Sequence, residues 1–275
     1  STLPPFRPLN KSTPPSPSAL SFSCNLLVMQ IILAGGCMGV DSNGWVYYLP
    51  EGDNRSSSPS PLLPPKPPGS DMTVTGLWQN GMITNYAYIL HVNNAAGRVQ
   101  GNMDGGGIVF PWVTDFKDEI KDRDCRVGCW RDLRVSKYLL NKGPSMLSLQ
   151  YSTLSHHVTE SMSELTYCLY LARVLPLEWL RLVVRRDFVP GHYSGDLHRL
   201  WELSPDELTR EFYDNPDVFK SRHPELMGDI KAPGWCGDAE STIKYHRDLL
   251  EGSVVSEGLN NWIDLNFGVA LSGSE

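Results

Sequence analysis

Two proline- and serine-rich stretches restrict where this 275-residue chain can form a packed core. Residues 1–20 and 51–70 hold few apolar residues, and their composition favours polyproline II or disordered backbone. We therefore expect residues 1–73 to be largely linker. The bias ends at Val74, where helical periodicity begins, so the sequence predicts one domain over 74–275. Because the first residue is Ser rather than Met, we expect the chain to be a fragment.

One apolar segment, Cys24–Val40, lies between these two stretches. Asn25, Gln30 and interspersed glycines interrupt it, whereas a membrane-spanning helix needs about 20 largely apolar residues. The segment is therefore expected to form a buried strand or a short helix. The core of a signal anchor stays open as an alternative if a segment is missing upstream.

The net charge and the cysteines argue against several classes of protein. A formal charge of −7 argues against general nucleic-acid binding and against electrostatic attraction to anionic membranes, since both need an excess of Lys and Arg. The six cysteines form no paired framework, which is typical of free thiols in a reducing, cytosolic compartment. Cys125 and Cys129 lie four residues apart, but no second Cys or His pair follows at zinc-site spacing. We therefore expect no metal and no cofactor.

Three helices are expected in the second half of the chain. An apolar stripe with spacings of four, three, four and three predicts the first helix, which Pro176 ends. The second is expected over Leu177–Arg186, and the third over Asp238–Glu251 with a stop at Gly252. The stretch Gly101–Gln150 has no sustained period, which predicts irregular backbone. The stripe of the first helix consists of Val158, Met162, Leu165, Leu169 and Ala172.

Six carboxylates crowd the stretch Trp201–His223, which raises the possibility of a catalytic acid cluster. Helix capping is the simpler interpretation. Ser204 is expected to be an N-cap, Pro205 the first helical residue and Glu207 the partner in a capping box. Asp206 adds negative charge near the positive end of the helix dipole.

The same device repeats shortly afterwards, where Asp214 is expected in a turn. Asn215 is expected to cap a helix that begins at Pro216, with Asp217 in its first turn. The aromatic side chains around this point should then face the core from two short helices. These side chains are Phe212, Tyr213 and Phe219.

An enzyme stays open as the alternative to a binding protein. A hydrolase or transferase would use an Asp and several His residues of the second half of the chain. The sequence, however, lacks a nucleophile elbow, a P-loop and a paired metal motif. A deep pocket with convergent titratable groups would favour the enzyme, whereas a shallow aromatic-lined groove would favour an interaction module. The candidate catalytic residues are His156, His157, Asp206 and His223.

Several separate motifs resemble the BEACH domain family and occur in the family's order. They are Asn85–Arg98, "NYAYILHVNNAAGR"; Ile108–Trp112, "IVFPW"; Trp201–Phe219; and the ending His246–Gly273, "HRDLLEGSVVSEGLNNWIDLNFGVALSG". The resemblance covers about residues 74–273. It marks as structural motif residues Asn85, Tyr86, Trp112, Ser204, Pro205, Glu207, Phe212, Tyr213, Pro216, Phe219, Trp262, Asp264 and Phe267.

The resemblance implies a mostly α fold, in which short helices surround a core of extended, irregular peptide. It implies no catalytic activity. Members of the family act as scaffolds in membrane trafficking and affect vesicle fission and fusion, endosome and lysosome maturation, and autophagy. The expected partners are other proteins, including a PH-like or WD-repeat domain of the full-length chain, and the expected location is cytoplasmic, peripheral on endosomal or lysosomal membranes.

Two further stretches resemble one branch of that family, in which a kinase-like region precedes the BEACH domain and a WD-repeat propeller follows it. They are Trp130–Gly143, "WRDLRVSKYLLNKG", and His156–Pro176, "HHVTESMSELTYCLYLARVLP".

A group of arginines is the candidate for contact with membranes or acidic partners. Arg181 and Arg185 share a face of the second expected helix, with Arg186 beside them and Arg173 just before it. A solvated face partly paired with Glu178 is the simpler interpretation, and a phosphoinositide or acidic-peptide contact is the alternative. We expect the domain alone to be soluble, to need a partner for recruitment, and to bind membranes weakly in a salt-sensitive way.

Overall fold

A computed structural model describes residues 37–40, 46–49, 73–98, 107–123, 127–153, 161–186 and 193–268. The chain divides into two compact units, residues 1–56 and 57–275, and each is described by itself. The predicted domain boundary at residue 74 stays a prediction.

The first unit contains a short β-hairpin. Strands β1 (Cys37–Val40) and β2 (Val46–Leu49) pair antiparallel, with Cys37 opposite Leu49. β1 forms the end of the apolar segment predicted over 24–40, so the strand expectation is confirmed for these four residues. Residues 24–36 lie outside the described part.

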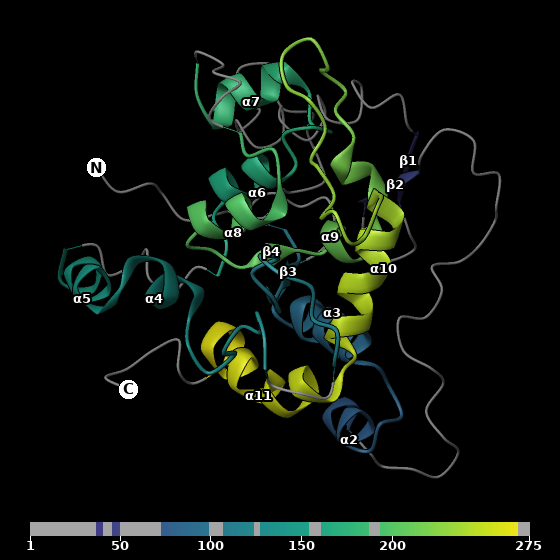
Figure 1. Ribbon diagram of the computed structural model, residues 1–275, viewed down its shortest axis with the longest axis vertical. Helices are drawn as coiled ribbons and strands as arrows, with labels where there is room; N and C mark the ends of the chain where they lie inside the picture. Colours follow the sequence, from purple (N-terminus) through teal and green to yellow (C-terminus); the bar gives the residue numbers. More distant parts are fainter. Residues whose placement is uncertain are drawn as a thin grey trace, which may run out of the picture. The chain divides into compact units, whose positions relative to one another are not determined.

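The second unit is mostly helical, which confirms the predicted fold class (Figure 1). Ser, Thr or Asp side chains cap many of the helices by accepting a hydrogen bond from the backbone of the first turn, which explains why the helices begin where they do. The helices are α2 (Val74–Gln79), α3 (Asn85–Ala95), α4 (Lys137–Lys142), α5 (Pro144–Thr153), α6 (Glu164–Tyr170), α7 (Leu177–Val183), α8 (Leu197–Leu203), α9 (Glu211–Asp214), the 3-10 helix η2 (Pro216–Phe219), α10 (Ala239–Leu250) and α11 (Ser253–Phe267).

Extended peptide runs through the centre of this unit, as the family resemblance implies. Residues 107–114 are all buried, and Val109 and Trp112 have no exposed surface. Only two residues of this run form a strand, β3 (Val109–Phe110), which pairs antiparallel with β4 (Leu208–Thr209). Figure 1 shows this pair at the middle of the helices.

Side chains supply the hydrogen bonds that a wider sheet would give to this buried backbone. The amide of Asn93 on α3 accepts from Val109 N at 2.8 Å and donates to Val109 O at 2.9 Å. The hydroxyl of Tyr213 donates to Pro111 O at 2.6 Å, and Arg131 donates to Trp112 O at 3.4 Å. These backbone groups of the extended core therefore have hydrogen-bond partners without neighbouring strands on both sides.

The predicted helix over Val158–Ala172 is wrong in extent, and its buried face is confirmed only at Met162 and Ala172. Val158 lies outside the described residues. Ser163 caps α6, because its hydroxyl accepts from Thr166 N at 3.2 Å, so the helix begins only at Glu164. Leu165 of the predicted stripe is 45% exposed, and Leu169 is half-buried. The buried side chains of α6 are instead Thr166, Tyr167, Cys168 and Tyr170.

Of the two other predicted helices, one is confirmed and one is shorter than predicted. The helix predicted over Asp238–Glu251 is confirmed as α10, with Asp238 as its N-cap, and the second helix ends at Val183 rather than at Arg186. The prediction of irregular backbone over 101–150 is wrong for α4 and α5. Gly143 separates them with a φ of +79°, so the glycine ends one helix and Pro144 begins the next.

Helix α10 packs on α9 and η2, and α11 packs on both α10 and α3. Residues from both ends of the second unit thus meet along α3. Among the residues that the structure describes, no helix is long and apolar enough to cross a membrane.

Candidate functional site

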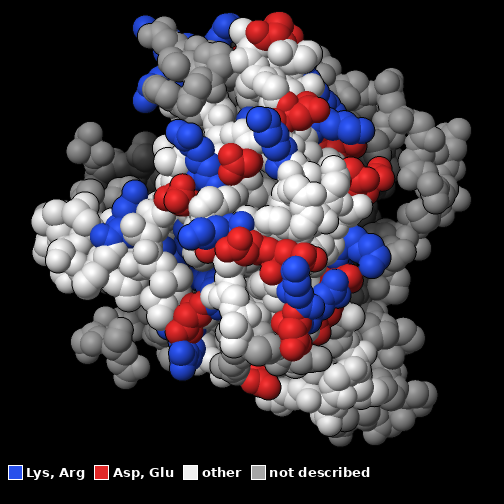
Figure 2. Space-filling model, viewed as in Figure 1, with Lys and Arg blue, Asp and Glu red and all other residues white. Residues whose placement is uncertain are grey.

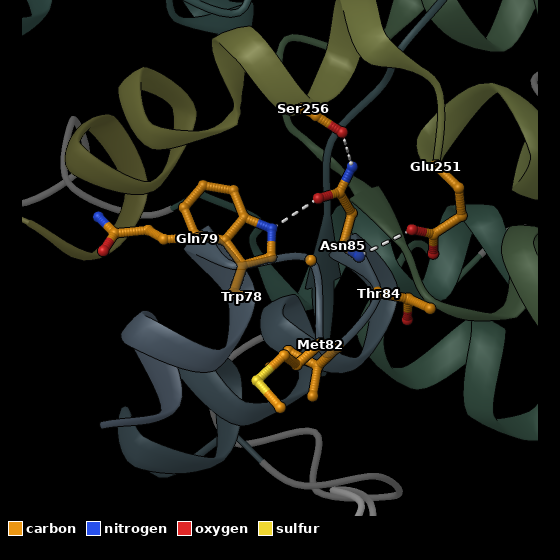
Figure 3. A pocket seen from close by; sticks show the side chains of 9 residues that line it. Trp78, Gln79, Met82, Thr84, Asn85, Glu251 and Ser256 are labelled. Atoms are coloured by element: carbon orange, nitrogen blue, oxygen red, sulfur yellow. Dashed lines mark hydrogen bonds between the residues drawn. The ribbon is translucent and has the colours of Figure 1, made fainter. Parts of the chain in front are cut away.

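A hollow of about 550 Å³ lies where the turn between α2 and α3 meets the junction of α10 and α11 (Figure 3). Most of its lining comes from the stretch Trp78–Asn85, and α10 and α11 contribute Glu251 and Ser256. The side chains of Trp78, Met82 and Ile83 give it apolar walls.

The turn that forms this wall is fixed by local sequence. Gly81 has a φ of +67°, in the left-handed region that glycine adopts without strain. Thr84 then caps α3, since its hydroxyl accepts from Ala87 N at 3.1 Å. The Trp78 ring stacks on Tyr88 of α3 with centroids 4.5 Å apart, which holds α2 against α3.

The base of the hollow is a set of hydrogen bonds around Asn85. Its side chain accepts from Trp78 Nε1 at 2.6 Å and donates to Leu250 O at 2.7 Å and to Ser256 Oγ at 2.8 Å. The carboxylate of Glu251 accepts from the backbone N of Asn85 at 2.7 Å and of Tyr86 at 3.1 Å. A negative charge is thereby held at the positive end of α3, although Glu251 follows Asn85 by 166 residues.

Tyr86 links this base to a chain of charged groups. The Arg247 guanidinium lies 3.2 Å from the centre of the Tyr86 ring and pairs with Glu251 at 3.7 Å. The Tyr86 hydroxyl donates to Asp214 at 2.5 Å and accepts from Arg210 Nε at 2.9 Å. Burial, together with the bond to Asp214, raises the pKa of Tyr86 to about 12. At neutral pH the Tyr86 hydroxyl therefore keeps its proton, and its role is to link Asp214 and Arg210.

The hollow suits binding rather than reaction. The polar groups of Asn85 and Glu251 are occupied by their bonds to the protein, so they hold the shape of the base. Met82 is 46% exposed at its edge, and Figure 3 shows it apart from the hydrogen-bonded groups. Such a surface can accept an apolar side chain of a partner.

The helix predicted to begin at Pro205 does not form, so the capping-box prediction is wrong. Ser204 is the C-cap of α8, and the chain continues into strand β4. The Ser204 hydroxyl accepts from Tyr170 OH at 2.6 Å and from Asp206 N at 3.2 Å. The bond from Asp206 N to the Ser204 hydroxyl, two residues apart, is typical of a turn rather than of a helix start. After this turn the backbone continues into β4, which pairs with β3.

Glu207 is buried and forms an ion pair with Arg131. The two side chains are 3% and 0% exposed, and the guanidinium donates two bonds to the carboxylate at 2.5 and 2.6 Å. Lys137 lies close by and donates to the carbonyls of Trp201 at 2.8 Å and Ser204 at 2.5 Å. Burial, with Arg131 nearby, lowers the pKa of Lys137 to about 7.

The predicted cap at Asn215 and the predicted burial of Phe212, Tyr213 and Phe219 are confirmed. Asn215 caps η2 by accepting from Asp217 N at 3.0 Å, and Pro216 is its first residue. Asp214 ends α9 instead of lying in a free turn. The buried rings form two chains of contacts: Tyr86, Phe110 and Tyr213; and Trp112, Tyr170, Phe212 and Phe219.

The last three motif residues, Trp262, Asp264 and Phe267, lie on α11. Trp262 has no exposed surface and packs against the half-buried Phe267 with ring centroids 5.8 Å apart. Asp264 is exposed on the opposite side of the helix from the core.

The predicted arginine cluster is divided by the structure. Arg181, Arg185 and Arg186 are exposed, but Arg173 is 2% exposed and donates from Nε to Gly228 O at 3.2 Å. Burial lowers the pKa of Arg173. The interpretation of Arg173 as a surface contact is therefore wrong, because its guanidinium lies in the core.

The two candidate catalytic residues that the structure describes, Asp206 and His223, bind different partners. His223 Nε2 bonds to Leu175 O at 2.7 Å, and Asp206 accepts from the backbone and hydroxyl of Ser163, each at 3.1 Å. His156 and His157 lie outside the described residues. Within the described residues, no group of His, Cys, Asp or Glu could hold a metal ion.

Sequence reasoning missed Arg131, Glu251 and His246 as site or core residues. His246 is buried, stacks on Tyr213 with centroids 3.8 Å apart, and bonds from Nδ1 to Phe212 O at 3.1 Å. Burial lowers its pKa to about 3. All three residues lie inside stretches that resemble the family, but these stretches carry several other charged residues, so no local signal distinguishes the three.

Comparison with known proteins finds several relatives. The chain is 40% identical over 199 residues to "Suppressor of organelle fusion 2" of Caenorhabditis elegans and 36% identical over 215 residues to human "WD repeat-containing protein 81". It is 30% identical over 268 residues to "Probable inactive serine/threonine-protein kinase lvsG" of Dictyostelium discoideum. Each match covers 72% of this chain, but only 14%, 11% and 12% of the respective relative.

The family profile described as "Beige/BEACH domain" matches residues 76–275, which include the extended core, the hollow and all the motif residues listed above. Relatives with WD-repeat and kinase names agree with the predicted branch. The chain belongs to the Beige/BEACH domain family, and its relatives include BEACH/WD-repeat proteins and one with a kinase-like N-terminal region.

Proposed function

We propose that this chain is a non-enzymatic scaffold in membrane trafficking, acting in endosome and lysosome maturation, autophagy, or vesicle fission and fusion. The relatives support a trafficking role, since one of them is named a suppressor of organelle fusion. The chain would sit peripherally on endosomal or lysosomal membranes through protein partners. A PH-like or WD-repeat domain of the full-length chain would be among these partners.

One observation carries the non-enzymatic part of the proposal. The ionisable groups beside the hollow are used to hold the fold: Glu251 binds the start of α3, and Arg247 covers the Tyr86 ring. Catalytic acids and bases instead need a free position within reach of a substrate. The surface left open at the hollow is that of Trp78 and Met82, which suits a protein that inserts an apolar side chain.

Quantitative affinity capture tests this proposal. The chain serves as bait in a cytosolic extract, and the captured proteins are compared between the parent and Met82→Glu by mass spectrometry. We expect Met82→Glu to lose trafficking proteins that the parent captures, because a carboxylate at the edge of the hollow would have to be desolvated. Leu165→Glu is the matched control, since Leu165 is 45% exposed on α6 and lies outside the hollow.

Two outcomes would contradict the proposal. Identical captured proteins for the parent and Met82→Glu would exclude the hollow as the binding surface. A hydrolase or transferase activity of the purified chain that disappears in Asp206→Asn would contradict the non-enzymatic role and support the alternative.

A further inference from the structure

Helix α5 leaves its side chains largely uncovered. It packs against α4, and none of its side chains that the structure describes is buried. Met146 is 47% exposed and Leu149 52% exposed. A ten-residue helix is only marginally stable alone in water, so an uncovered apolar one implies a second environment that stabilises it.

Neighbouring elements carry two further exposed leucines. Asn141 of α4 donates to Glu202 O of α8 at 2.5 Å, which holds the two helices together. Leu140 and Leu203 are next in sequence to this contact, and they are 45% and 55% exposed. We call the group Leu140, Met146, Leu149 and Leu203 the α5 patch.

The surroundings of the patch carry no charge along α5. Residues 143–153 contain no Asp, Glu, Lys or Arg, and the surface over α5 is white in Figure 2, whereas charges of both signs intermingle elsewhere on that face. Ser145, Ser148 and Ser152 recur at spacings of three and four, so they share one face of the helix. The helix thus combines a hydroxyl-bearing face with exposed Met and Leu.

The size of the patch argues against a stable protein interface. Each of its four side chains is about half exposed, so covering them removes on the order of 200 Å² of apolar surface. A stable protein–protein interface buries roughly 800 Å² on each partner, of which about 56–58% is apolar. Helix α5 itself adds no charge that a protein partner could pair, and the charges nearest in sequence to the patch residues are Lys142 and Glu202.

A lipid surface has no such minimum area, and an interfacial helix binds it through its buried apolar area plus attraction to anionic lipids. Here the second contribution is missing, since α5 is uncharged and the whole chain carries −7. Binding through apolar area alone depends on gaps between lipid headgroups, which are more frequent on strongly curved membranes.

We propose that α5 and the α5 patch form a direct contact with curved, lipid-packing-defective membranes, with Met146 and Leu149 inserted at the headgroup boundary. This goes beyond the scaffold role, because it assigns to the chain itself a lipid contact that needs no partner. It also places that contact on α5 rather than on the arginines of α7. Partner capture at the hollow and vesicle binding at α5 are measured separately, so either can fail alone.

Vesicle flotation of the 275-residue chain tests the proposal. The vesicles are neutral phosphatidylcholine, either small and strongly curved or large and nearly flat, with and without added salt. We expect binding to the small vesicles, little binding to the large ones, and no effect of salt. Met146→Ser combined with Leu149→Ser should weaken binding at least about tenfold, because two apolar side chains no longer insert.

Leu182→Ser is the matched control, since Leu182 of α7 is 54% exposed and lies outside the patch. Leu149→Trp should tighten binding without touching the core, because indole rings favour the membrane interface. Unchanged circular dichroism of each variant verifies that it is folded.

Three results would overturn the proposal. The first is no binding of the parent to neutral vesicles of either size. The second is binding that requires anionic lipid, falls with salt and disappears in Arg181→Ala with Arg185→Ala. The third is a parent chain that light scattering shows as a dimer and the Met146→Ser, Leu149→Ser variant as a monomer, which would make the patch an interface between two copies.

Discussion

Replacing Glu207 by Gln separates the two accounts of this residue. If Glu207 closed a capping box, Gln would serve nearly as well, because either side chain can bond back to the cap. In the structure, however, Glu207 is the buried partner of Arg131. Gln keeps the shape of the side chain but removes the charge, so it leaves a guanidinium in the core without its counter-ion.

The contacts set the magnitude of this effect. Breaking a buried ion pair on one side costs about 3–5 kcal/mol. Arg131 keeps its bonds to Trp112 O at 3.4 Å and to Val135 O at 3.2 Å, which places the expected loss toward the lower part of that range. With an urea m-value of about 2 kcal/mol per molar, the midpoint of unfolding should fall by on the order of 1.5 M.

Equilibrium urea unfolding, followed by tryptophan fluorescence, measures this shift. Arg131→Met combined with Glu207→Leu provides the second arm, since removing both charges should recover much of the stability lost in the single variants. A midpoint shift for Glu207→Gln below about 0.5 M would refute the ion-pair reasoning and favour a cap. A double variant that loses as much stability as the sum of the two single variants would refute it as well.

Three further predictions concern the core and the hollow. Trp262→Ala should lower the free energy of unfolding by about 3–5 kcal/mol, because Trp262 has no exposed surface; a loss below about 1 kcal/mol in urea would contradict its role as an anchor. His246 has its pKa lowered to about 3 in the folded state from 6.5, so its contribution to stability is complete above pH 6.5 and is lost progressively as the pH falls toward 3. Between pH 6 and 5 the parent should therefore lose about 1 kcal/mol more than His246→Phe, and equal pH slopes for the two would count against this. Glu251→Ala should cost about 1–2 kcal/mol and speed amide exchange of Asn85 and Tyr86, whereas unchanged exchange would mean that Glu251 does not hold the start of α3.

Local sequence signals predicted the structure well where the hydrogen-bond partner is close in the chain. The cap at Asn215, the limits of α10 and the burial of the aromatic residues all follow from neighbouring residues or from the apolar character of the side chain. The helix predicted over Val158–Ala172 is too long because the Ser163 cap starts it later, although Met162 and Ala172 of its stripe are buried. Ser163 is itself a residue type that favours an N-cap, but the apolar spacing across it favoured a longer helix.

The capping box at Ser204 failed for a different reason. Ser-Pro-Asp-Glu is a good helix start in isolation, but the backbone after Ser204 is needed as the partner of β3, and Glu207 is needed opposite Arg131. Tertiary contacts overrode a local preference worth about 1 kcal/mol. The hollow was missed because it joins Trp78 and Asn85 to Glu251 and Ser256, whose meeting no local pattern indicates.

The cap that Glu251 provides for α3 has a consequence during protein synthesis. The Glu251 carboxylate, which accepts from the backbone N of Asn85 and of Tyr86, is synthesised 166 and 165 residues after them. At about 5–20 residues per second, a ribosome needs roughly 8–33 s to reach it. During that interval, α3 and the apolar peptide after it lack the helices that cover them in the finished domain. A nascent chain of this domain is therefore expected to depend on chaperones until its last helices emerge.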